Sequence, residues 1–236
     1  MKNLYLLLLV GFTISACTQE KKKNLVKHQE QANLLNREYL IAFLDTIWHK
    51  EQEPVRMRDT MAAKYGVESE QAKKYQQIYI QNHKVNEQKI RHLLDTYGWP
   101  DKAISGEYGN WTICNVIQHS DNKIRLKYLP MMKQAVKDKK LEVRFLVRAE
   151  DRIATSTGNL QIYGGQMKYY AETKTFNVWP VYDPINIDKR RAEVGLEPIA
   201  PYLKRRFNFE WNLEEQIKRS EEFEKQKLTN KNEENH

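Results

Sequence analysis

Polar side chains cluster at the end of one predicted helix and in the glycine-containing loop that follows it. Asp151 and Arg152 end the helix, and the loop carries Gln161, Tyr163 and Gln166. Glycine lets the backbone approach other groups closely, and amide and phenol groups offer hydrogen-bond donors and acceptors. A guanidinium group binds carboxylate or phosphate through two parallel hydrogen bonds. These residue types predict a polar site that either ties the loop to the helices or lines a pocket for an anion.

Arg56, far upstream, is the second candidate for anion binding, and two carboxylates could neutralise the two arginines. Glu51 and Asp151 are the natural internal partners of Arg56 and Arg152. If all four pair with one another, the cluster is a closed structural network, because buried charges need partners whether or not they do chemistry. If they do not, the arginines are free to bind a ligand. Both interpretations stay open from sequence.

His119 is the histidine with the most motif-like setting, directly after Gln118. At the end of a helix it could simply satisfy a carbonyl group or the helix dipole. It could also act as a general acid or base close to Asp151. Cys114, five residues earlier, lies among apolar residues and is predicted to belong to the core.

The sequence gives no pattern for a metal or a cofactor. His49 and His83 lie on predicted helices without carboxylate partners at ligand spacing, and neither HExxH nor CxxC occurs. The glycine pair at 164–165 lacks the surroundings of a phosphate loop or a dinucleotide fingerprint. We therefore expect neither a metal site nor a cofactor.

The N-terminus has the layout of an export signal. Lys2 precedes an apolar run, Leu4 to Ile14, that is too short to span a bilayer and closes on Ser15-Ala16-Cys17. A cysteine after small residues resembles the lipobox of bacterial lipoproteins, in which the thiol is acylated and becomes the first residue of the mature chain. An ordinary secreted protein with a chance cysteine is the alternative.

This pattern predicts where the protein resides. Residues 1–16 form a signal peptide, and residues 17–30 comprise the lipidated Cys17 and a flexible, lysine-rich tether. The partner implied is a bacterial membrane, reached through the lipid, with the domain outside the cytoplasm in the cell envelope. Thr18 is not the aspartate that signals inner-membrane retention in some bacteria, which favours the outer membrane.

The net charge of +8 would suit an anionic partner, but lysines and arginines are scattered among carboxylates. We do not expect nucleic acid as a partner, and a basic surface that contacts anionic envelope polymers is only a third hypothesis. The 30% of charged and 11% of aromatic residues are typical of a water-soluble, folded domain.

Apolar spacing predicts a mainly α fold, an irregular helical bundle with a small β-hairpin near its C-terminal end. A single α-rich domain is expected over 31–203, followed by a charged extension, 204–236, that is partly helical or disordered. Ser69, Asn110, Asp121 and Asn186 are candidate helix caps, and Pro54 and Pro130 should interrupt their helices. The elements expected are helices from 34, over 69–97, 110–119, 121–139, 141–154, 186–195 and 209–223, and strands over 166–172 and 176–181.

Several short motifs, in this order, resemble a bacterial family of unknown function, the domain-of-unknown-function 6624 family, from about Leu40 to Tyr202. Glu51 stands where the family has aspartate, and Gly165 stands where it has threonine, so a hydroxyl is missing from the loop. The resemblance implies a fold and a polar site, but no established activity. The motifs are Glu51-Gln52-x-x-x-Arg56, Gly98-Trp99-Pro100, Gln118-His119, Asp151-Arg152, Gly158-x-x-Gln161-x-Tyr163-Gly164-x-Gln166 and Arg190-Arg191-x-x-x-Gly195-Leu196.

Two functions follow as hypotheses of different classes. The first is a lipid-anchored extracytoplasmic protein whose domain is a binding or structural module for an unknown ligand. The second is a hydrolase-like enzyme in which His119 and Asp151 act as acid and base while Arg56 and Arg152 hold an anionic substrate. The enzyme hypothesis requires His119, Asp151 and Arg152 to meet in an open cleft.

Overall fold

The computed structural model describes residues 37–106, 108–170 and 175–233. Over these ranges the chain is mainly helical, with one two-stranded antiparallel hairpin towards its C-terminal end, which confirms the predicted fold class. The predicted signal peptide, Cys17 and the tether lie outside the described residues. In the described part, no helix combines the length and the apolar character that a bilayer crossing requires.

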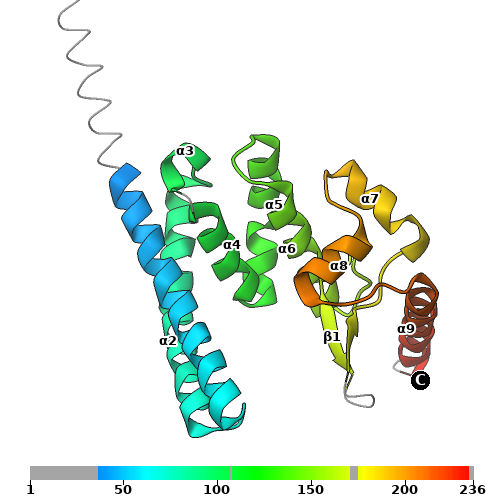
Figure 1. The fold of residues 1–236 in the computed structure, drawn as a ribbon. Coiled ribbons are helices and arrows are strands. Elements are labelled where there is room, and N and C mark those ends of the chain that lie inside the picture. The colour runs from blue at the N-terminus through cyan, green and yellow to red at the C-terminus, as the bar shows by residue number, and fades with distance from the viewer. Residues whose placement is uncertain (1–36, 107, 171–174, 234–236) are drawn as a thin grey trace, which may run out of the picture.

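Two long antiparallel helices form one side of the molecule (Figure 1). The first covers residues 37–65, and α2 (Glu70–Tyr97) returns alongside it. As predicted, Ser69 caps α2, because its hydroxyl accepts a hydrogen bond from the amide of Ala72, and Gly98 ends the helix with a φ of 72°. The Asn82 side chain donates to the Lys50 carbonyl across the pair at 2.9 Å.

Four further helices pack beside this pair: α3 (Lys102–Ser105), α4 (Gly109–His119), α5 (Asn122–Lys137) and α6 (Val143–Ser156). The main core lies among the long helices and includes Cys114, which is buried as predicted. Its other fully buried side chains recur at intervals of three or four residues along their helices, so each helix contributes one apolar face. They are Leu44, Ile47, Ile90, Leu94, Ile113, Val116, Ile117, Tyr128, Met132 and Ala149.

A second, smaller core lies under the hairpin and the last helices. Val178, Val181, Ile187, Ile199 and Leu203 are its buried residues. Figure 1 shows these elements grouped beside the main bundle. They are β1 (Met167–Tyr170), β2 (Thr175–Val178), the short 3₁₀ helix η1 (Pro184–Asn186), α7 (Ile187–Glu193), α8 (Ile199–Phe207) and α9 (Leu213–Glu233). The predicted extension is thus helical over most of its described length.

Some local predictions were wrong. The first helix runs through Pro54 and α5 runs through Pro130 without a break. Proline removes one backbone hydrogen bond, but burial of flanking residues, such as Tyr128 and Met132 in α5, offsets that local cost. Asn110 does not cap α4, because its side chain instead accepts from the Trp99 indole and donates to the Lys140 carbonyl, both at 2.8 Å.

Candidate functional site

Asp151 holds the loop that follows α6. Its carboxylate is buried, and one oxygen accepts hydrogen bonds from the amides of Ile162 and Tyr163 at 2.8 and 2.9 Å. The other oxygen accepts from the amide of Gly165 at 2.8 Å. Three backbone donors therefore surround one carboxylate, which a residue in the last two turns of α6 points towards the glycine-containing loop.

Burial is the largest influence on the pKa of the Asp151 carboxyl group. Loss of hydration raises the pKa of Asp151 to about 6, although the three amides and the positive charge of Arg191 act in the opposite direction. The hydrogen bonds of the carboxylate come from backbone amides, and the side chains of Arg152 and His119 have other partners.

Gln161 closes the same loop on itself. Its side-chain amide donates to the carbonyls of Gln166 and Trp179, at 3.0 and 2.8 Å. Its side-chain oxygen accepts from the backbone amide of Gln166 at 2.8 Å. Gln161 is completely buried, so both predicted glutamines take part in a fixed turn.

Two arginines of α7 hold the carbonyl side of the loop. Arg190 donates to the Ile162 carbonyl at 3.3 Å, and Arg191 donates to the Tyr163 carbonyl at 2.5 Å. Gly164 adopts a φ of 78°, and a Cβ there would lie 2.7 Å from a methyl group of Ile199. Residues 161–166 therefore form a rigid frame that is bonded on both its amide and its carbonyl sides.

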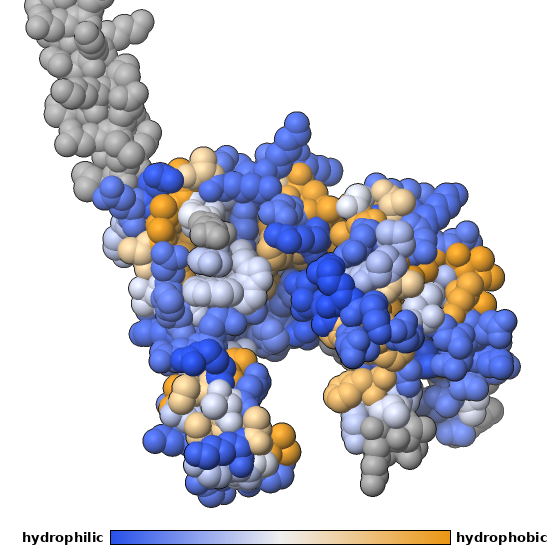
Figure 2. Space-filling view, in the orientation of Figure 1, coloured by the Kyte–Doolittle hydropathy of each residue, from blue (hydrophilic) through white to orange (hydrophobic). Residues whose placement is uncertain are grey.

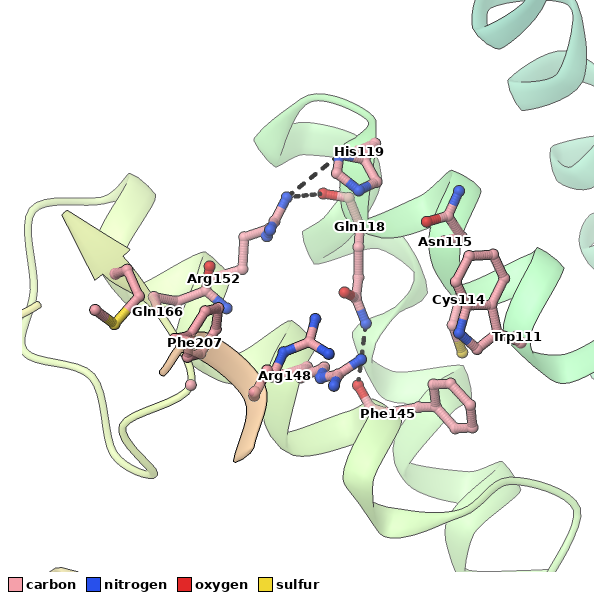
Figure 3. A pocket seen from close by; sticks show the side chains of 13 residues that line it. Trp111, Cys114, Asn115, Gln118, His119, Phe145, Arg148, Arg152, Gln166 and Phe207 are labelled. Atoms are coloured by element: carbon pink, nitrogen blue, oxygen red, sulfur yellow. Dashed lines mark hydrogen bonds between the residues drawn. The ribbon is translucent and has the colours of Figure 1, made fainter. Parts of the chain in front are cut away.

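Arg152 turns away from Asp151 towards the C-terminus of α4. Its guanidinium donates to the Gln118 carbonyl at 3.3 Å and lies 3.5 Å from the ring Nδ1 of His119, as Figure 3 shows. Arg125 donates to the same Gln118 carbonyl at 3.1 Å. The two arginines thus supply positive charge at the negative end of the helix dipole.

Next to this helix end lies a cavity of about 300 Å³, which we call the arginine pocket. Arg148, Arg152 and Arg206 line it, and no aspartate or glutamate of the described chain does. Figure 2 shows strongly hydrophilic side chains gathered at the middle of the visible face, between the helical bundle and α8. The other lining residues are Trp111, Cys114, Asn115, Gln118, His119, Phe145, Gly165, Gln166, Met167 and Phe207.

The three guanidinium groups are close enough to repel one another. Burial, together with the positive charges of Arg125, Arg148 and Arg206, lowers the pKa of Arg152. Burial and the charge of Arg148 also lower the pKa of Arg206. Within the described ranges, none of these three arginines forms an ion pair with a carboxylate. The pocket therefore carries uncompensated positive charge.

His119 lies at the rim of the arginine pocket. Its ring is still partly open to solvent, yet loss of hydration on the pocket side and the charge of Arg152 lower the pKa of His119 to about 4. The imidazole is therefore neutral at pH 7 and can accept a hydrogen bond.

This acidity predicts a pH effect on stability. The unfolded histidine takes up a proton near pH 6.5, whereas the folded one stays neutral down to about pH 4, so stability is lost as pH falls through this window. In His119→Gln, the decrease in the free energy of unfolding between pH 7 and pH 5 should be smaller than in the wild type by about 1 kcal/mol. The effect is no larger because solvent screens the partly exposed ring. Urea unfolding at pH 7 and pH 5 measures it. His92→Gln, at an exposed position of α2, should keep the wild-type slope. An equal change of the free energy of unfolding with pH in the wild type and in His119→Gln would contradict the assignment of this pH effect to His119.

Glu51 and Arg56 lie apart from this pocket. Glu51 is fully buried and is hydrogen-bonded by His83 Nδ1 at 3.1 Å and by the Asn86 amide at 2.8 Å. Arg56 is exposed and lines a separate cavity beside Trp48. The four-residue ion-pair network that the sequence allowed does not form, because each carboxylate has other partners.

Sequence reasoning missed two arginines of the pocket and one buried contact between the long helices. Arg148 and Arg206 stand in no motif, and the Glu51–His83 pair joins two helices that only the antiparallel packing brings together. Pairing the first helix with α2 could have suggested the last contact. Across the residues that the structure describes, no group of three histidine, cysteine or acidic side chains could hold a metal ion.

Comparison with known proteins gives one match. A family model described as a family of unknown function, DUF6624, matches residues 50–211, which contain the loop frame and the arginine pocket. No curated protein and no solved structure matches the chain.

Proposed function

The chain belongs to the DUF6624 family, whose function is unknown, and we propose that its domain binds a phosphate-like anion in the arginine pocket. One observation supports the proposal above all others: three arginines line a cavity that has no acidic residue among its described lining. A bound anion would remove the repulsion among the guanidinium groups and accept hydrogen bonds from them.

Binding is favoured over hydrolysis by the state of the two candidate catalytic groups. Both oxygens of Asp151 accept hydrogen bonds from loop amides, so this carboxylate serves the loop. With a pKa of about 4, His119 is a weak base at neutral pH, whereas efficient general bases titrate near the working pH. His119 instead suits a role as a neutral neighbour of the anion.

A direct binding measurement tests this proposal. Calorimetric titration of the full-length protein with inorganic phosphate should give saturable binding, and phosphate should raise the melting temperature. Arg148→Gln should weaken binding about 10-fold, the effect of losing one charge-assisted hydrogen bond. Arg144→Gln is the matched control, because Arg144 lies one turn away on α6 and pairs with Glu142 at 2.7 Å. An absence of phosphate binding, or equal losses in both variants, would refute the proposal.

We also propose that the domain is carried outside the cytoplasm by a lipid on Cys17, with the outer membrane as the favoured location. The sequence order of Lys2, an apolar run and Ser15-Ala16-Cys17 supports this assignment. Cells fed labelled palmitate should label the wild-type chain, and Cys17→Ser should abolish the label and leave the leader uncleaved. Cys114→Ser is the control and should label normally, since Cys114 is buried in the core. Label that persists in Cys17→Ser would contradict the proposal.

A further inference from the structure

A second, larger cavity adjoins the arginine pocket. This second lobe has a volume of about 650 Å³, against about 300 Å³ for the arginine pocket. The two cavities are neighbouring parts of one cleft, because five residues line both of them. The shared residues are Trp111, Phe145, Arg148, Gly165 and Arg206.

The charges that belong to the second lobe alone are balanced. Arg144 pairs with Glu142 at 2.7 Å, and Arg205 pairs with Glu197. Arg191 donates to backbone carbonyls and lies within the field of Asp151. Three arginines thus face three carboxylates there, whereas the described lining of the arginine pocket has no carboxylate. Because Arg148 and Arg206 line both cavities, the uncompensated positive charge lies in the arginine pocket and on the wall that the two cavities share.

Aromatic and polar groups both line the second lobe. Trp111, Phe145, Tyr163 and Tyr202 contribute rings to its lining. The ion-paired side chains at 142, 144, 197 and 205 offer both donors and acceptors beside those rings. A lining of aromatic faces with a few fixed polar groups is typical of small-molecule sites. It suits a ring that has apolar C–H faces and hydroxyl groups at its edge, as a sugar does.

Resting on the proposed anion binding, we propose that the ligand is a sugar phosphate whose phosphate occupies the arginine pocket and whose sugar occupies the second lobe. The shared wall explains the fit. Gly165 lines both cavities, and its backbone amide is held by Asp151. Arg148 and Arg206 also line both, so they can contact the phosphate and the first atoms of the sugar. A free phosphate would leave the larger part of the cleft unused.

Titrations of the full-length protein test this assignment. The probes are inorganic phosphate, glucose 6-phosphate, adenosine 5′-monophosphate and the uncharged compounds glucose and adenosine. At least one phosphorylated sugar should bind about 10-fold more tightly than inorganic phosphate, and the uncharged compounds should not bind measurably. Tighter binding of adenosine 5′-monophosphate would identify the source as a nucleotide, and tighter binding of glucose 6-phosphate would identify it as a free sugar phosphate.

A filling variant separates the two lobes. Leu196 is half-buried and lines only the second lobe. Leu196→Trp should abolish the extra affinity for the sugar phosphate and leave the affinity for inorganic phosphate unchanged. Val194→Trp is the control, because Val194 is equally half-buried and lines neither lobe.

The outcomes distinguish this inference from the proposal beneath it. If inorganic phosphate binds and neither sugar phosphate binds more tightly, the second lobe is not a sugar site and the anion site stands. Equal loss of phosphate and sugar phosphate binding in Leu196→Trp would also overturn the two-lobe assignment. If no phosphate compound binds, both proposals fail together.

Discussion

Replacement of Asp151 by alanine is expected to lower the free energy of unfolding by about 3–5 kcal/mol, at the upper end of the effects that single substitutions have on stability. The reason is that the carboxylate is the hydrogen-bond acceptor for three loop amides, those of Ile162, Tyr163 and Gly165. Each amide left without a partner costs about 1–3 kcal/mol, partly offset because a buried charge is also removed. Urea unfolding measures the change.

The cost should also depend on pH in a defined direction. Because the folded pKa of Asp151 is raised to about 6, above the unfolded value of 3.8, the folded state binds the proton more tightly. The group therefore stabilises the fold most at low pH, and this contribution declines as pH rises through 6. Asp151→Ala should consequently cost more at pH 5 than at pH 8.

Asp121→Ala is the matched control for this prediction. Asp121 accepts one backbone hydrogen bond, from Ile124 at the start of α5, so its loss should cost only about 1 kcal/mol. Similar costs for the two variants would mean that the loop does not depend on the Asp151 carboxylate. A cost that grows towards pH 8 would mean that burial does not control its acidity.

Much of the fold could be predicted because its signals are local. Ser69, Asp121 and Gly98 mark helix ends by chemistry that acts within one turn, and the structure places each as expected. The hairpin follows from short runs of aromatic and β-branched residues. The predictions at Pro54 and Pro130 failed because packing of a whole helix outweighs one missing hydrogen bond. Helix α8 was not predicted, since it is short, follows Pro198, contains Pro201 and offers only Ile199 and Leu203 as buried apolar residues.

The candidate site could be predicted only in part. The polar residues 151, 161, 163 and 166 stand in one recognisable stretch, and they prove to build one loop frame. The positive charge of the pocket comes from elsewhere: Arg148 and Arg206 lie far apart in the sequence and belong to no motif. A site formed by side chains of separate helices has no local signature, because the tertiary packing creates the juxtaposition.

The double variant Arg148→Gln/Arg206→Gln should lose phosphate binding by about 100-fold, since each guanidinium supplies a charge-assisted hydrogen bond of about 1.4 kcal/mol or more. Its stability in anion-free buffer should nevertheless match or exceed that of the wild type. In the empty pocket, burial and, after it, the positive charge of Arg148 lower the pKa of Arg206, so both lost hydration and repulsion oppose the charged form of this side chain. Removing both charges ends this repulsion and breaks no ion pair, because neither arginine has a carboxylate partner within the described ranges.

Calorimetry with phosphate and thermal unfolding without it measure the two effects in the same protein. Arg144→Gln/Arg205→Gln is the matched control, because these arginines lie on the same two helices and pair with Glu142 and Glu197. This control should retain phosphate binding and gain no stability. When the residues of a binding site destabilise the ligand-free protein, their replacement is expected to weaken binding and raise stability together. Two results would contradict this prediction: normal phosphate binding by the double variant, or a loss of its stability. Either one would show that the charge cluster serves the fold and not a ligand.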